Sequence, residues 1–136
     1  MNSELKLVIF EEKKILQCLL ELLDEQYNLI LSKDIIALGS IANKIEEEGK
    51  NLANIEIKRR NIATEEEFNN FIKNTDDEHI IKVYEEIKKI IIKLQDQKDI
   101  NNTLIKQKLF FTNKMISIIK PSKGVNTYNS YGKVMR

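Results

Sequence analysis

The residues that could support metal binding are few and adjacent in this sequence. The chain has a single histidine, His79, which closes the run Asp76-Asp77-Glu78-His79. This run lies at the start of a predicted helix, where acidic residues are favoured by the positive end of the helix dipole. Carboxylate metal sites in helical proteins use Glu-x-x-His pairs on different helices, which one histidine cannot supply. We therefore expect no metal site.

Nucleophilic catalysis has equally little support in the sequence. The only cysteine, Cys18, is flanked by leucines, which is typical of a buried and unreactive thiol. The chain contains no Gly-x-Ser-x-Gly motif and no glycine-rich phosphate loop. A Cys–His or Ser–His–Asp unit could form only around His79. We expect no catalytic residue, no cofactor and no enzymatic activity. A small helical enzyme or metal protein around His79 remains as an alternative hypothesis.

Composition narrows the class of protein further. A chain of 136 residues has the length of one domain, and 22 basic against 21 acidic residues leave a net charge of +1. This balance argues against a nucleic-acid partner, which requires a dominant basic field. No apolar stretch approaches the roughly 20 residues needed to span a bilayer, and no apolar signal segment is visible. The sequence therefore predicts a cytoplasmic protein without a membrane-inserted segment.

Few helix-breaking residues and a repeated apolar spacing predict an all-α fold. The chain has four glycines and one proline. Apolar residues recur every three or four positions over 3–31 and 35–60, which is typical of amphipathic helices. Glu12 and Glu48 interrupt these two rows. A short connection between the segments predicts an antiparallel hairpin. Gly49, inside the second segment, indicates either a bend or a neighbour that approaches closely.

Two further helices are expected after the hairpin. Thr64 and Glu67 form a capping-box pattern that predicts a short helix over 64–73. Residues 78–120 contain neither glycine nor proline and predict one long helix, which Pro121 ends. The predicted architecture is a helical bundle domain over 1–120, resembling a three-helix bundle or coiled coil, with a flexible tail over 121–136. Residues 120–136 contain four basic residues and no acidic residue, which suits an acidic partner surface.

The end of the long helix carries more apolar residues than a single packed face requires. At 1.5 Å per residue, a helix over 78–120 is longer than either arm of the hairpin and is expected to extend beyond it by about 15–20 Å. Its last residues are apolar on more than one face, whereas packing on one hairpin needs a stripe of about 100°. The surplus predicts an interaction surface formed by Leu104, Ile105, Leu109, Phe110, Phe111, Met115, Ile118 and Ile119. The alternatives are a second copy of the chain, or coverage by segment 64–73 with differently offset helices.

Three segments of the sequence resemble the FlgN family of flagellar export chaperones. Asn101-Asn102-Thr103-Leu104-Ile105 is similar to an N-x-x-L-I segment of that family. Thr127 to Lys133 resembles its terminal T-Y-G-x-x-G-K motif, with Asn129 in place of the first glycine. The stretch from Leu22 to Asp34 resembles the family's opening helix.

This resemblance implies a function and two binding regions. Members of the family bind the C-terminal helices of hook–filament junction (hook-associated) proteins, prevent premature assembly and deliver these clients to the type III export gate. The apolar surface from Leu104 to Ile119 then corresponds to the client-binding region. Tyr128 and Gly132 in the tail motif correspond to the residues that dock on the export apparatus. The competing hypothesis is a structural coiled-coil or self-associating adaptor, including a homodimer, without a role in export.

Overall fold

The computed structural model describes residues 2–119, except for the side chains of residues 109–112 and 119, and this part of the chain is helical without any strand. The helices are α1 (Asn2–Ser32), α2 (Ile35–Ile62), α3 (Glu65–Asn74) and α4 (Glu78–Ile119). The all-α fold class is confirmed, and each helix begins and ends within two residues of the position expected from the sequence. The flexible tail expected over 121–136 lies outside the described residues.

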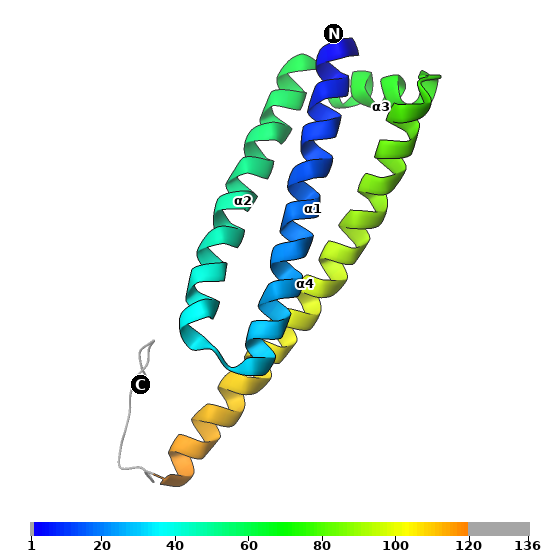
Figure 1. The fold of residues 1–136 in the computed structure, drawn as a ribbon. Coiled ribbons are helices and arrows are strands. Elements are labelled where there is room, and N and C mark those ends of the chain that lie inside the picture. Colours follow the sequence, from blue (N-terminus) through cyan, green and yellow to red (C-terminus); the bar gives the residue numbers. More distant parts are fainter. Residues whose placement is uncertain (1, 120–136) are drawn as a thin grey trace. The chain divides into compact units, whose positions relative to one another are not determined.

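The chain divides into two compact units, Met1–Asn101 and Asn102–Arg136. The first unit contains the helical hairpin, α3 and the first part of α4. In this unit α1 and α2 run antiparallel, α3 crosses the end where α1 begins, and α4 runs back alongside α1 (Figure 1). Contacts from α1 to both neighbours make it the central helix: Lys58 of α2 reaches Glu11, and Glu86 of α4 accepts a hydrogen bond from Lys13.

The turn between α1 and α2 is stabilised by local hydrogen bonds. Lys33 adopts a positive φ of 61° in the two-residue connection between α1 and α2. Asp34 then caps α2, because its carboxylate accepts a hydrogen bond from the backbone N–H of Ala37. The capping box expected at α3 is also present: Thr64 Oγ1 accepts from the Glu67 N–H, and the Glu67 carboxylate accepts from the Thr64 N–H.

The apolar rows expected from the sequence form the core of the first unit. The apolar row on α1 consists of Tyr27, which is half-buried, and six buried residues: Leu5, Ile9, Leu16, Leu19, Leu23 and Ile30. At the α3 end, buried side chains from the different helices form one cluster: Leu5, Ile9, Leu16, Ala63, Phe68, Ile80 and Ile87. Because burial of one such aliphatic or aromatic side chain contributes about 1.5–3 kcal/mol, this cluster is the main reason that the short helix α3 is held in place.

Phe68 connects three helices at this end of the bundle. Its side chain is buried, and the guanidinium of Arg59 in α2 lies 4.5 Å from the centre of its ring. Tyr84 of α4 meets the ring edge-on, with the two ring centres 6.1 Å apart. Aromatic and cation–π contacts of this kind add to the burial of the ring itself. Phe68 thereby ties α3 to both α2 and α4.

The two glutamates that interrupt the apolar rows lie between α1 and α2. Burial raises the pKa of Glu12, and the nearby Glu56 raises it further, whereas the charge of Arg59 acts in the opposite direction. Glu48 lies beside Cys18, and burial together with this carboxylate raises the pKa of the Cys18 thiol. The thiol is therefore kept in its protonated, less reactive form.

Gly49 is exposed, and a Cβ atom built on it would meet nothing within 4 Å. One of the two sequence-based expectations was a neighbour that approaches Gly49 closely. That expectation is wrong, because the space beside Gly49 is open. Replacing Gly49 by alanine is expected to raise the free energy of unfolding by about 1 kcal/mol, since alanine restricts the unfolded chain and suits a helix interior. Urea denaturation followed by circular dichroism measures this change.

Ala53→Gly in the same helix is the matched control, because Ala53 is also exposed. It is expected to lower the free energy of unfolding by a similar amount. An unchanged or lower stability of Gly49→Ala would contradict the open environment described for Gly49.

Candidate functional site

The second half of α4 exposes apolar side chains to solvent. We call residues 104–119 the distal α4 segment. Within it, Met115, Ile116 and Ile118 are 41%, 53% and 68% exposed, whereas Leu104 and Ile105 are half-buried. Exposed apolar residues that lie close together are typical of an interaction site. Of the described residues of the predicted surface, Met115 and Ile118 are exposed to solvent, and Leu104 and Ile105 are partly exposed.

These exposed side chains do not share one narrow face. In an α-helix each residue turns the chain by about 100°, so Met115 and Ile118 lie about 60° apart, whereas Ile116 and Ile118 lie about 160° apart. A single packed stripe would cover about 100°. The distal α4 segment therefore offers apolar contacts on two sides of the helix, which is consistent with a partner that wraps around it or with two contacting helices.

Several residues predicted for the site lie outside the described part of the structure. Leu109, Phe110, Phe111 and Ile119 lie in the helical backbone of α4, but their side chains are outside the described residues. Tyr128 and Gly132, predicted to dock on the export apparatus, lie outside them altogether. Their roles remain predictions from the resemblance stated above.

The apolar face of α3 is used within the first unit. Phe68 packs in the cluster with Leu5, Ile9 and Ile80, and Phe71 and Ile72 pack against the same cluster. The sequence allowed segment 64–73 to cover the last third of the long helix instead. That alternative is wrong, because the described apolar side chains of α3 are packed at the start of α4.

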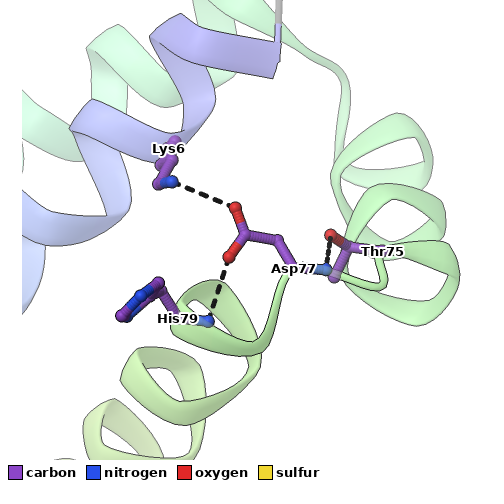
Figure 2. A network of polar contacts seen from close by, with 4 residues as sticks. All are labelled: Lys6, Thr75, Asp77 and His79. Atoms are coloured by element: carbon purple, nitrogen blue, oxygen red, sulfur yellow. Dashed lines mark hydrogen bonds and ion pairs between the residues drawn. The ribbon is translucent and has the colours of Figure 1, made fainter.

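The acidic run that precedes α4 acts as a helix cap and a cross-link to α1. Figure 2 shows Asp77 accepting hydrogen bonds from the Lys6 ammonium at 3.0 Å and from the backbone N–H of His79 at 3.0 Å. The Asp77 N–H in turn donates to the hydroxyl of Thr75. His79 contributes its backbone and not its imidazole to this network. Among the described residues, no group of three or more His, Cys, Asp or Glu side chains could hold a metal ion.

Two lysines of α1 pair with acids on the α4 side. Lys6 bonds Asp77, and Lys13 bonds Glu86 at 2.9 Å. The pKa of Asp77 lies below its ordinary value of 3.8, chiefly because of the hydrogen bond from Lys6, with the backbone N–H groups of His79 and Ile80 acting in the same direction. The Lys13 hydrogen bond lowers the pKa of Glu86 in the same way. Both carboxylates are therefore stabilised in their charged form.

Asn101 is a residue to which sequence reasoning assigned no role beyond the family motif. Its side chain is 1% exposed, and its amide nitrogen donates to the Leu23 carbonyl and to Gln26 Oε1, each at 2.9 Å. Its amide oxygen accepts from Gln97 Nε2 at 2.9 Å. The signal in the sequence was its spacing: Asn101 lies seven residues after Leu94 and three before Leu104, so it falls with Gln97 on the same face as these apolar residues.

Comparison with known proteins identifies one family. The family model described as "FlgN protein" matches residues 1–135, essentially the whole chain. No curated protein and no solved structure matches the sequence. None of the helices in the described part of the chain is both long and apolar enough to cross a membrane.

The contact between Lys6 and Asp77 predicts a pH-dependent contribution to stability. Because the folded pKa of Asp77 is depressed, the stabilisation is present above the unfolded pKa and is lost as pH falls through the folded value, below 3.8. Asp77→Asn is expected to lower the free energy of unfolding at neutral pH, because Asn can still cap α4 but cannot pair as an anion with Lys6. The difference from the parent protein should shrink as pH is lowered past 3.8.

Urea denaturation at a series of pH values measures this difference. Asp76→Asn is the matched control, because Asp76 is exposed and adjacent in sequence, and it is expected to have a smaller effect. A difference between Asp77→Asn and the parent that does not depend on pH would contradict the ion pair.

Proposed function

Because the chain belongs to the FlgN family, we propose that it binds the C-terminal helical region of flagellar hook–filament junction proteins and delivers them to the type III export gate. FlgN is a family of flagellar export chaperones, and membership implies binding to hook-associated proteins and to export machinery. The finer statements are our proposal: the helical region that is bound, the prevention of premature assembly and the delivery step. A cytoplasmic location belongs to the same proposal, because clients must be bound before export.

The exposure of Met115, Ile116 and Ile118 is the observation that supports a client surface on the distal α4 segment. A client helix with an apolar face could bind there in the helix-in-groove mode, driven by burial of these side chains. Methionine adapts its shape to different partners, which suits a chaperone that binds more than one client. We include Leu104, Ile105, Leu109, Phe110, Phe111, Ile118 and Ile119 with Met115 in the proposed client-binding residues.

The tail is proposed to dock on the export apparatus. Residues 120–136 contain Lys120, Lys123, Lys133 and Arg136 and no acidic residue. This charge favours an acidic surface on the receiving protein. Tyr128 and Gly132 are the proposed docking residues, on the basis of the family motif to which they correspond.

A self-associating adaptor is the second candidate, because the same exposed residues could bind a second copy of the chain. Light scattering at several protein concentrations distinguishes the two functions. A chaperone is expected to form a complex of defined size with its client even if the free chain associates. An oligomer that persists in the presence of junction proteins and excludes them would favour the adaptor.

Charged substitutions on the distal α4 segment test the client surface. Met115→Asp combined with Ile118→Asp is expected to weaken binding of the junction proteins at least about tenfold, because burial of each apolar side chain contributes about 1.5–3 kcal/mol and 1.4 kcal/mol corresponds to a tenfold change in Kd. Both residues are exposed, so the helical circular dichroism should be unchanged. Calorimetry with purified junction protein measures the affinity.

Ile35→Asp combined with Ile36→Asp is the matched control. These two isoleucines are 80% and 88% exposed at the turn between α1 and α2, outside the proposed surface. The control variant is expected to retain parental affinity. Retained affinity in the Met115 and Ile118 variant would refute the proposed client surface.

Removal of residues 121–136 separates client binding from export. The truncated chain is expected to bind junction proteins with at most a modest loss of affinity, whereas secretion of those proteins and swimming motility should fail. Tyr128→Ala in the full chain should reproduce the export defect, and Tyr131→Ala is its matched control. Normal motility of the truncated chain would contradict the docking role.

A further inference from the structure

Asn101 is the polar exception in the interface between α1 and α4. Among the described side chains it is the only polar one that is buried, at 1% exposure. Its neighbour on α1, Leu23, is buried and apolar, and two to three turns earlier on α4 Ile90 and Leu94 pack against the apolar core cluster. A buried amide is costly unless its donors and acceptor are all satisfied.

Every hydrogen-bonding group of the Asn101 amide is used. Its two donor hydrogens serve the Leu23 carbonyl and Gln26 Oε1, both on α1, and its oxygen accepts from Gln97, one turn earlier on α4. The three bonds are each 2.9 Å long. The Leu23 and Gln26 bonds join residues more than 70 positions apart in sequence, so they fix one helix against the other.

The remaining contacts between α1 and α4 define their alignment less strictly. Leucine, isoleucine and valine at spacings of three and four can be exchanged for one another when a helix shifts by one turn, about 5 Å. The ion pairs Lys6–Asp77 and Lys13–Glu86 are partly exposed and join flexible lysines, so their side chains can follow small shifts. A one-turn shift, in contrast, would remove both α1 partners from the buried Asn101 amide.

We infer that Asn101 is the residue that determines the axial register of α4 on α1. In the observed register Asn101 is satisfied. After a one-turn shift Asn101 would lose the side-chain acceptor Gln26 and would face Leu22 or Ile30, one turn away on α1, in its place. Gln97 or Ile105 would then occupy the position of Asn101. A single buried asparagine has this effect in coiled coils, where it selects one alignment at some cost in stability. Asn101 therefore excludes alternative alignments that the aliphatic residues alone would permit.

The register also has a consequence for client binding, and this consequence rests on the proposed function. Asn101 is the last residue of the first compact unit, and the proposed client surface begins three residues later at Leu104. The hydrogen bonds from Asn101 to α1 therefore lie at the end of the first unit, three residues before the proposed surface in the sequence of α4. A different register would change which residues of α4 remain for a client.

A distance measurement between α1 and α4 tests the register directly. Lys14 and Lys98 are exposed residues of the first unit, and each is replaced by cysteine for spin labelling in a Cys18→Ala background. The two labels lie at different heights along the bundle, so an axial shift changes their separation. The parent protein is expected to show one narrow distance. Asn101→Leu should remain helical and show a second or displaced distance, with a change approaching 5 Å for a one-turn shift.

Asn102→Leu is the matched control, because Asn102 is exposed and adjacent in sequence. It is expected to keep the parental distance. Asn101→Ala is the second test variant and should broaden or displace the distance like Asn101→Leu. A parental distance in both Asn101 variants would overturn the inference. Loss of helical circular dichroism in both variants would also overturn it, because Asn101 would then maintain the fold and not select among registers.

Client capture by the same variants separates this inference from the proposed function. Asn101→Leu is expected to capture purified junction protein several-fold less well than Asn102→Leu. A displaced distance with unchanged capture would sustain the register role and count against the distal α4 segment as the client surface. A parental distance with reduced capture would overturn the register role and leave the proposed function standing.

Discussion

The first unit depends on the shared burial of α1 between two neighbours. Its apolar residues recur along the whole helix, and seven of them, from Leu5 to Ile30, are buried. On one side α1 pairs with α2 through the hairpin turn, and on the other its lysines and Leu23 contact α4. Because α1 contacts both α2 and α4, the surface that it presents to each helix helps to position that helix.

Two different kinds of contact hold the ends of this arrangement. At the α3 end an aromatic cluster around Phe68, supported by Arg59 and Tyr84, joins three helices without strict directionality. Near the other end a directional amide contact from Asn101 joins α4 to α1. Apolar packing supplies most of the stability of such a bundle, whereas hydrogen bonds from a buried amide select one alignment among several that pack almost equally well. The structure combines both.

The distal α4 segment differs from the first unit in what its apolar residues do. In the first unit Ile80 and Ile87 of α4 pack in one cluster with side chains of α1 and α3. In the distal α4 segment Met115, Ile116 and Ile118 are exposed. Within one continuous helix, the same residue types thus pack in a core in one part and are exposed to solvent in another. The proposed client binding would use this division, because a client helix needs a binding surface that the chaperone's own chain leaves open.

The sequence by itself determined the helices and their ends, because these depend on local chemistry: the spacing of apolar residues, the Thr64–Glu67 capping box and the absence of glycine and proline from residues 78–119. It also indicated the FlgN family and the excess of apolar residues near the end of α4. Only the tertiary structure decided where α3 packs, that Gly49 faces open space, and that Asn101 bonds to α1. These outcomes depend on contacts between residues far apart in the chain, and periodicity within one helix says which residues share a face but not which partner that face meets.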